Sequence, residues 1–458
     1  MASVDPNIFR AYDIRGKAHT QITSEACELI GKGFGSILIE MYGESPNIVV
    51  GRDARTHGKE FEQSIINGLV STGCNVHLIG QTPSPVNYFT ICNEKLDAGV
   101  QITASHNPKE DNGIKLQIRD AEAFAGDDLQ TLKNRISEGS FVSGAGEVHE
   151  LDGITPYVER LVSSFKRVGD GLSIGIDSGN GVAGPLYKEV LEKVGCTVYG
   201  LFIEPDGEFP NHPADPSKHS TLADLQKLVK TESLNLGFAY DGDGDRVGLV
   251  DENSKIITAD EVLLMLAKDH LQRFPSNPVI FTVSNSGTLH TEIEKWGGKP
   301  VMCKVGHSYV EHAMRDNNAL LGGEQSGHFF CAEEYFGFDD ALVTTLRLLS
   351  IFKNSGKSVS ELCLDFPKVY QSPEQRPFCP DNAKASIIER VIEHFTKEYP
   401  VETMDGARID FGKGGWAGIR MSNTSPCLSI CIEARSEESL QNIEQIVLRH
   451  LKTYDELK

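Results

Sequence analysis

The sequence lacks any long apolar run. A membrane-spanning helix needs about 18 consecutive apolar residues, and no such stretch occurs among the 458 residues of the chain. The first residues include Asp5, Arg10 and Asp13, so they do not form the apolar core of a signal peptide. We therefore expect a cytoplasmic protein that has no membrane partner.

The sequence also lacks paired cysteines. Its ten cysteines are scattered, and none belongs to a Cys-x-x-Cys motif. A structural zinc site and a dithiol redox motif are therefore not predicted. We expect reduced thiols, as in most cytosolic proteins.

Positive charge is scarce. The chain has 44 Lys and Arg against 65 Asp and Glu, which gives a formal net charge of −21. This balance argues against a nucleic-acid partner and against binding to anionic membranes. A phosphate ester would be repelled by the overall field. Its binding would require a local cluster of arginines, lysines and helix N-termini.

The length indicates several domains. Strand patterns alternate with helix patterns through most of the chain, which is typical of an α/β layer architecture. The last part interleaves strands and helices less regularly, so we expect a small α+β domain there. The predicted domains are residues 1–150, 151–253, 254–367 and 368–458. One helix is predicted over residues 24–42, with Thr23 or Ser24 as its N-cap, and residues 139–146, rich in Gly and Ser, are predicted to form a flexible link.

The first three domains form a weak repeat. In each, a buried strand ends in an unusual polar loop, at Ser105, at Asp241 and at Glu324. Ligands of open α/β sheets bind at the carboxyl ends of strands. We therefore expect three related α/β domains with mixed sheets, followed by the C-terminal α+β domain. The three polar loops could converge on one cleft.

Ser105 lies in the loop Thr103-Ala104-Ser105-His106-Asn107-Pro108. Proline disfavours the α region for the residue before it, which restricts the loop at Asn107. A serine at this place is a candidate nucleophile, although serine is also common as ordinary turn chemistry.

The loop Asp241-Gly242-Asp243-Gly244-Asp245 carries a carboxylate at every second position. Its glycines permit a tight curve that can turn all three carboxylates toward one point. Three carboxylates that close together need a cation, and hard oxygen ligands select Mg²⁺ or Ca²⁺. An EF-hand is excluded because Arg246 occupies the position where that loop needs glycine. The alternative is an exposed acidic turn.

Two further loops are ambiguous on their residues alone. Residues 420–426 join two predicted strands and combine an arginine, hydroxyls and an amide, which suits a phosphate. On these residues alone, however, an ordinary hairpin turn with a salt-bridged arginine is favoured. Glu324, Ser326 and His328 could bind sugar hydroxyls or form a structural turn. Lys115 and His307 are single residues, and a lone Lys or His is more often a solvated or satisfied side chain than a catalyst.

Taken together, these loops resemble the four signature loops of the α-D-phosphohexomutases, in the family's order and at its spacing. An N-terminal motif and a later Gly-Phe-Asp-Asp motif are similar to its phosphomannomutase/phosphoglucomutase branch. The residues that carry the resemblance are 103–108, 241–246, 323–328, 420–424, 9–16 and 337–340.

The resemblance implies a phosphoserine enzyme that interconverts hexose 1-phosphates and hexose 6-phosphates of mannose or glucose. Ser105 would carry the phosphoryl group, and Mg²⁺ would be held by Asp241, Asp243, Asp245 and the phosphate on Ser105. Glucose 1,6-bisphosphate is the expected activator, and a monomer or weak dimer the expected state.

The resemblance also assigns the remaining site residues. The acid/base candidates are Lys115 and His328, and Arg246 would supply positive charge at the transferring group. Sugar hydroxyls would bind Glu324 and Ser326. The non-reacting phosphate would bind Arg420, Ser422, Asn423 and Thr424. Other family active-site or cleft positions are Tyr12, Arg15 and His307.

Some residues depart from the family pattern. The dual-specificity branch commonly has Met in place of Gln325, and it has a lysine near residues 283–286, where this chain has none. Both departures favour the phosphoglucosamine mutase branch as an alternative, whereas the N-terminal motif opposes it. His57 stands where the family usually has serine, for which we have no interpretation. A phosphoserine-dependent sugar phosphatase is the other alternative, because water can hydrolyse a phosphoserine beside a metal.

Overall fold

The computed structural model describes residues 4–43, 45–422 and 425–457. The chain divides into two compact units, each described here by itself. Unit 1 comprises residues 1–266 and 326–363, and unit 2 comprises residues 267–325 and 364–458. None of the described helices is long and apolar enough to cross a membrane.

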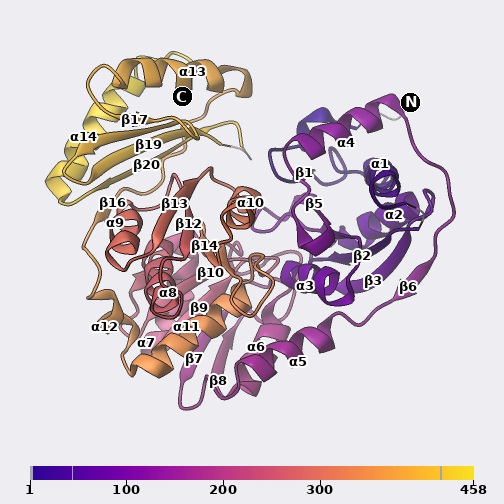
Figure 1. Cartoon of the computed structure of the whole chain (residues 1–458), viewed down its shortest axis with the longest axis horizontal. Coiled ribbons are helices and arrows are strands. Elements are labelled where there is room, and N and C mark those ends of the chain that lie inside the picture. The colour runs from indigo at the N-terminus through magenta and orange to yellow at the C-terminus, as the bar shows by residue number, and fades with distance from the viewer. Residues whose placement is uncertain (1–3, 44, 423–424, 458) are drawn as a thin grey trace. The chain divides into compact units, whose positions relative to one another are not determined.

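Unit 1 begins with a six-stranded mixed sheet in the order β1-β5-β4-β2-β3-β6 (Figure 1). Strands β2, β3, β4 and β6 run parallel, and β1 and β5 run against their neighbours. Its strands are β1 (Ile14–Lys17), β2 (Asn47–Arg52), β3 (Asn75–Gln81), β4 (Ala98–Ile102), β5 (Asp111–Ile118) and β6 (Val148–Glu150). Its helices are α1 (Ser24–Tyr42), α2 (Gly58–Val70), α3 (Ser84–Glu94) and α4 (Asp127–Glu138).

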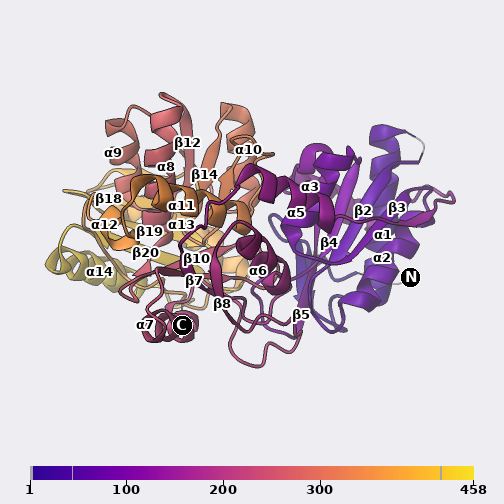
Figure 2. The same cartoon turned by 90° about the horizontal axis from the view of Figure 1, so that it is seen from below.

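Alternation along β4 separates the two faces of this sheet. Val100 belongs to the hydrophobic core shared with α1 and α2. Gly99 points the other way, where an added Cβ would meet Ile91 of α3 at 2.5 Å. Helices α1 and α2 thus cover one face and α3 the other (Figure 2). Helices on both faces explain why every residue of β4 is buried, as is usual for parallel strands between helix layers.

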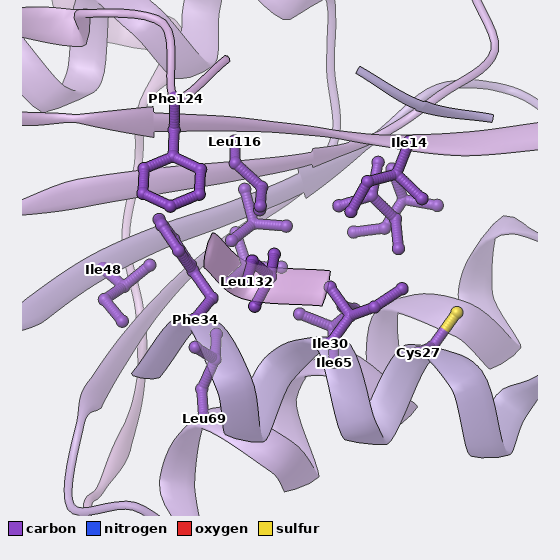
Figure 3. Packing of buried hydrophobic residues seen from close by; sticks show 14 of the residues in the cluster. Ile14, Cys27, Ile30, Phe34, Ile48, Ile65, Leu69, Leu116, Phe124 and Leu132 are labelled. Atoms are coloured by element: carbon purple, nitrogen blue, oxygen red, sulfur yellow. The ribbon is translucent and has the colours of Figure 1, made fainter. Parts of the chain in front are cut away.

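The prediction of helix 24–42 is confirmed by α1. Thr23 caps it by accepting a hydrogen bond from the N–H of Ala26 at 3.1 Å. Its apolar stripe includes Ile30 and Phe34, and Phe34 packs edge-on against Phe124 with ring centroids 5.2 Å apart (Figure 3). The helix period and the cap together therefore define this element.

The prediction of a flexible link at 139–146 is wrong. Gly144 and Gly146 each donate a backbone hydrogen bond of 2.9 Å, to the carbonyls of Ser71 and Val70. Val142 donates its N–H to Ser36 Oγ at 2.9 Å. The segment continues into β6, which pairs with β3. Every residue of β6 is exposed, so no apolar alternation in the sequence indicates this strand.

A second sheet in unit 1 has the order β11-β10-β9-β7-β8. Strands β7, β8 and β9 are parallel and β10 is antiparallel to β9, so it repeats the arrangement of β2, β3, β4 and β5. Its strands are β7 (Ser173–Asp177), β8 (Thr197–Leu201), β9 (Leu236–Tyr240), β10 (Val247–Asp251) and β11 (Ile256–Ile257). Its helices are α5 (Ile154–Ser164), α6 (Gly184–Lys193) and α7 (Ala223–Thr231). Unit 1 also contains β15 (Phe329–Cys331), α11 (Ala341–Ser355) and α12 (Val359–Cys363).

Unit 2 contains a parallel set of strands in which β12 lies between β13 and β14. These strands are β12 (Pro278–Thr282), β13 (Lys299–Cys303) and β14 (Leu321–Gly323), with helices α9 (Gly287–Lys295) and α10 (His307–Asn317). Helix α8 (Ala259–Arg273) contains the boundary between the units, at Leu266 and Ala267.

The C-terminal part of unit 2 is an antiparallel sheet in the order β16-β20-β19-β18-β17. Helices α13 and α14 bury their apolar faces against it, as the α+β prediction requires. The strands are β16 (Tyr370–Gln371), β17 (Val401–Glu402), β18 (Ala407–Gly412), β19 (Gly415–Met421) and β20 (Leu428–Ala434), and the helices are α13 (Asp381–Phe395) and α14 (Glu437–Leu451).

Candidate active site

Ser105 follows β4 in a left-handed backbone conformation, with φ of 50°. Its N–H donates to Thr103 Oγ1 at 2.8 Å. Its hydroxyl donates to Asp241 Oδ2 at 2.6 Å and lies 3.1 Å from His106 Nδ1. The fold thus brings the serine loop and the aspartate loop together across 136 positions of sequence.

The aspartate loop lies between β9 and β10 and is fixed by its own first carboxylate. Asp241 Oδ1 accepts the N–H groups of Gly244 at 3.0 Å and of Asp245 and Arg246 at 3.1 Å each. Gly244 has φ of 78°, a conformation that glycine adopts without strain. The other oxygen of Asp241 remains directed at Ser105.

The three aspartates suit a hard cation. All three are fully buried, and one oxygen from each lies within 4.8 Å of the others. Asp243 Oδ1 and Asp245 Oδ1 have no hydrogen-bond partner among the described residues. Buried carboxylate oxygens without donors are costly unless a cation is present. The donor set therefore fits an oxygen-coordinated divalent ion.

Lys115 contacts the same carboxylates. Its Nζ donates to Asp243 Oδ2 at 2.8 Å and also to Asp245 Oδ2. Burial alone would lower the pKa of Lys115, but the two carboxylates raise it well above its usual value. Burial and the neighbouring Asp245 and Asp243 raise the pKa of Asp241. Burial opposes ionisation of Asp245 as well, but Lys115 lowers the pKa of that group.

Both ring nitrogens of His328 lie close to charged groups. Nδ1 lies 2.8 Å from Asp339 Oδ2 and 3.6 Å from Asp245 Oδ1. Nε2 accepts the Nε–H of Arg246 at 2.8 Å. This pairing puts the ring proton on Nδ1 and directs the basic lone pair of Nε2 at the guanidinium. Arg246, His328 and the aspartates thus form one buried network.

Arg15 lies at another edge of the serine loop. Its guanidinium donates to Asn107 Oδ1 at 2.9 Å and to Asp13 Oδ2 at 2.5 Å. Burial opposes the charge, but Asp13 raises the pKa of Arg15. Tyr12 precedes Asp13 and is partly exposed. A cavity of about 380 Å³ beside Ser105 is lined by His106, Lys109, Phe209 and Pro213, among others.

Other predicted site residues belong to unit 2. Glu324 is buried and accepts the N–H of Gly306 at 2.7 Å. Gly306 has φ of 142° and directly precedes α10. His307 is the first residue of that helix and is buried. Within unit 2, Glu324 therefore lies beside the N-terminus of α10, whereas Ser326 belongs to unit 1.

The loop after β19 is supported by two cationic residues that sequence reasoning missed. Arg376 Nη2 donates to Ser422 Oγ at 3.0 Å. Lys384 Nζ donates to the carbonyls of Ser422 at 2.9 Å and Ser425 at 2.7 Å. Arg420 is partly exposed on the same strand. Asn423 and Thr424 lie outside the described residues.

In unit 1, sequence reasoning also missed Ser84, Asp339 and Arg55. Ser84 Oγ donates to Asp243 Oδ2 at 2.6 Å. Asp339 lies in the motif at residues 337–340, to which no site role is assigned, and Arg55 lies two residues before His57. Ser84 and Arg55 contact the site across 159 and 50 positions of sequence, so no local pattern could have assigned their roles.

Models of one protein family match the chain in four consecutive blocks. The phosphoglucomutase/phosphomannomutase alpha/beta/alpha domains I, II and III match residues 6–143, 155–255 and 258–370. The C-terminal domain of the same family matches residues 378–450. The chain belongs to the phosphoglucomutase/phosphomannomutase family. Three related α/β domains and a C-terminal domain therefore agree with the predicted fold class.

Members of this family match the chain along nearly its full length. A phosphomannomutase/phosphoglucomutase of Pseudomonas aeruginosa is 39% identical over 450 residues, covering 98% of this chain and 96% of that protein. A phosphoglucomutase of Neisseria gonorrhoeae is 36% identical, covering 97% and 96%. The crystal structure of a phosphoglucomutase/phosphomannomutase family protein from Burkholderia thailandensis has a TM-score of 0.91, 34% identity and 98% coverage of both chains.

Proposed function

We propose that this protein interconverts hexose 1-phosphate and hexose 6-phosphate, with mannose and glucose phosphates as substrates. The reaction uses a phosphoserine at residue 105 and a hexose 1,6-bisphosphate intermediate. One observation supports it most directly: the Ser105 hydroxyl lies 2.6 Å from a carboxylate of the buried aspartate cluster. The names of relatives that match almost the whole chain support the same reaction.

In the first half-reaction, the free hydroxyl of a hexose 1-phosphate attacks the phosphorus carried by Ser105. The bond from phosphorus to Ser105 Oγ breaks, and the bisphosphate forms. Of the two acid/base candidates, His328 takes the hydroxyl proton. Lys115 is kept protonated by its two carboxylates and can act only as the acid. Arg246 stabilises the charge on the transferring group. The bisphosphate then reorients and returns its other phosphoryl group to Ser105, which leaves hexose 6-phosphate. Positioning and charge stabilisation dominate such loose phosphoryl transfers.

Asp241, Asp243 and Asp245 would hold Mg²⁺, with the phosphate on Ser105 as a further ligand. When bound, the ion supplies positive charge at the transferring phosphoryl group. The empty hydrogen-bonding positions of Asp243 Oδ1 and Asp245 Oδ1 support this assignment. Glucose 1,6-bisphosphate would act as activator by phosphorylating Ser105.

Substrate recognition is assigned to three groups of residues. Sugar hydroxyls would bind Glu324 and Ser326. The non-reacting phosphate would bind Arg420, Ser422, Asn423 and Thr424, of which the first two lie among the described residues. Tyr12, Arg15 and His307 would complete the recognition of substrate. We further propose the domain limits 1–150, 151–253, 254–367 and 368–458, and a monomer or weak dimer.

The phosphoglucosamine mutase alternative is not favoured, because the relatives reported above are named for mannose and glucose phosphates. The phosphatase alternative makes a distinct prediction. It requires release of inorganic phosphate from the sugar phosphate faster than isomerisation.

The test combines the purified protein with Mg²⁺, a trace of glucose 1,6-bisphosphate and each hexose 1-phosphate. We expect conversion of the mannose and glucose phosphates, and a loss of at least about 10³-fold in turnover for Ser105→Ala. Failure to convert mannose, glucose and glucosamine phosphates would exclude the mutase. Full turnover by Ser105→Ala would show that another group is the nucleophile.

A further inference from the structure

Arg55 is a fully buried arginine outside the residues assigned to chemistry or substrate. Its residue is 1% exposed. It follows β2, in the short segment that leads to α2. A buried guanidinium is costly unless all its donors are satisfied, so the partners that satisfy it indicate what it does.

All five N–H donors of the Arg55 guanidinium have partners. Three of them bind the serine loop, and a fourth binds Asp111, the first residue of β5. Nη2 donates to the carbonyl oxygens of Ser105 at 2.9 Å and Asn107 at 2.7 Å. Nη1 donates to those of Pro108 at 2.7 Å and Asp111 at 2.9 Å. A guanidinium has five donors in a planar fork. Four of these donors bind backbone carbonyls between Ser105 and Asp111, including the carbonyl of the nucleophile itself.

The fifth donor links Arg55 to the other side of the nucleophile. Nε donates to Asp53 Oδ2 at 3.1 Å. The same oxygen accepts the hydroxyl of Thr103 at 2.7 Å, and Thr103 Oγ1 accepts the N–H of Ser105. The carbonyl of Ser105 is thus held by Arg55 directly, and its N–H is held through Thr103 and Asp53.

The loop from the second sheet also approaches Arg55. Phe209 lies under its guanidinium, with Cζ 5.3 Å from the ring centroid, a favourable cation–π contact. At Gly207 an added Cβ would lie 2.5 Å from the carbonyl oxygen of Ala54. The guanidinium is therefore enclosed on several sides and has little freedom to move.

These contacts explain how Ser105 keeps its left-handed backbone. A non-glycine residue at φ of 50° is unfavourable and persists only where its surroundings determine it. The backbone N–H and carbonyl of Ser105 are both fixed, and the Arg55 network fixes them. We infer that Arg55 is a positioning residue that sets the orientation of the phosphorylated serine toward the substrate and the aspartates. This inference rests on the proposed function and adds to it the element that aligns the nucleophile.

Arg55→Lys tests the inference. Lysine keeps the charge but lacks the planar fork, so it cannot bind four carbonyls at once. We expect single-turnover transfer from phosphorylated Ser105 to glucose 1-phosphate to slow by about 10²-fold, as misplacement by about 1 Å would produce. We expect the KM to change no more than a few-fold. Amide exchange of residues 103–111 should accelerate, whereas exchange of α1 should not.

Arg52→Lys is the matched control. Arg52 ends β2, pairs with Glu62 at 3.3 Å and has no recorded bond to the serine loop. We expect wild-type transfer and wild-type exchange of residues 103–111 in this variant. A loss equal to that of Arg55→Lys would mean that any change near β2 has the same effect, which would overturn the inference.

Thr103→Val disrupts the same hydrogen-bond network more mildly. It provides the test if Arg55→Lys does not fold. It removes the hydroxyl between Asp53 and Ser105 N–H and keeps Arg55. We expect transfer about tenfold slower, a value in the range for one lost positioning hydrogen bond. Wild-type transfer by this variant, or wild-type transfer or loop exchange by Arg55→Lys, would overturn the inference. If the wild-type protein itself acquires no phosphate at Ser105 from glucose 1,6-bisphosphate, the proposed function fails instead.

Discussion

The loop after β4 and the loop after β9 occupy the same place in two sheets of the same order, yet they are fixed in opposite ways. At the serine loop, the guanidinium of Arg55 donates hydrogen bonds to four backbone carbonyls between residues 105 and 111. In the aspartate loop, one carboxylate collects three backbone N–H groups. Loops at equivalent places in the two sheets are therefore fixed by opposite charges: a cation that binds carbonyls in one, and an anion that binds N–H groups in the other.

The difference lies in where the fixing residue comes from. Asp241 belongs to the loop that it fixes, so the aspartate loop is determined locally. Arg55 lies 50 residues before Ser105, so the serine loop depends on another segment. We therefore expect the aspartate loop to keep its shape when its other residues are changed, and the serine loop to respond to distant substitutions.

The largest effect should come from Asp243→Asn. The amide oxygen can still accept from Ser84 and Lys115, which bond Asp243 Oδ2 at 2.6 and 2.8 Å. The loop should therefore keep its shape while the site loses a negative ligand for the cation. We expect kcat/KM to fall by about 10³-fold, because a metal ion supplies several kcal/mol of transition-state stabilisation.

Asp251→Asn is the control for this change. Asp251 is also buried and accepts backbone N–H groups, from Asn253 at 2.9 Å and Lys255 at 2.7 Å, but it lies at the far end of β10. Its activity should stay within about twofold of wild type. Equal losses in the two variants, measured by coupled assay at several Mg²⁺ concentrations, would contradict a metal role for Asp243.

A smaller effect is expected from Gly242→Ala, which alters the contact between the two loops. An added Cβ would lie 2.4 Å from the carbonyl oxygen of Ser105, the same atom that Arg55 binds. The loops must separate, and we expect turnover to fall by about 10²-fold, as for a misplaced reacting group. Steady-state kinetics give the value. Gly58→Ala, whose Cβ has no neighbour closer than 3.6 Å, should retain activity, and an unaffected Gly242→Ala would show that the contact is dispensable.

The smallest effect on activity is expected from Asp340→Asn. Asp340 resembles Asp241 in that one of its oxygens accepts several backbone N–H groups, here those of Leu342 and Val343 at 3.0 Å each. It caps helix α11. Burial raises the pKa of Asp340 to about 6, although Tyr335 and Tyr157 donate hydrogen bonds to it. Asparagine is a comparable helix cap without the titration.

The expected pH dependence follows from that pKa. The pKa of Asp340 is 3.8 in the unfolded chain and about 6 in the folded protein. The folded protein therefore binds this proton more tightly, and its stability falls as the pH rises from about 3.8 to about 6. The free energy of unfolding of Asp340→Asn, relative to that of the wild type, should therefore increase over this pH range by up to about 3 kcal/mol. Urea unfolding at pH 4 and pH 7.5 measures the change. A difference that is the same at both pH values would refute the raised pKa.

What could be predicted from the sequence was encoded locally. Helix α1 follows from its apolar period and Thr23, and the curved aspartate loop follows from alternating Asp and Gly. The roles of Arg55, Asp339 and Lys384 could not be predicted, because each depends on tertiary contacts with segments far away in the chain. Strand β6 could not be predicted either, because it is exposed and its strand state comes only from pairing with β3.

The pairing of β6 with β3 bears on how the first domain could be isolated. A fragment ending at Gly139 would lose the outermost strand and leave the backbone donors and acceptors along one side of β3 bare. An exposed edge strand of this kind can pair with strands from other molecules. We expect this fragment to aggregate and one that continues through Glu150 to remain dispersed. The segment joining the first two domains therefore also protects the first from self-association.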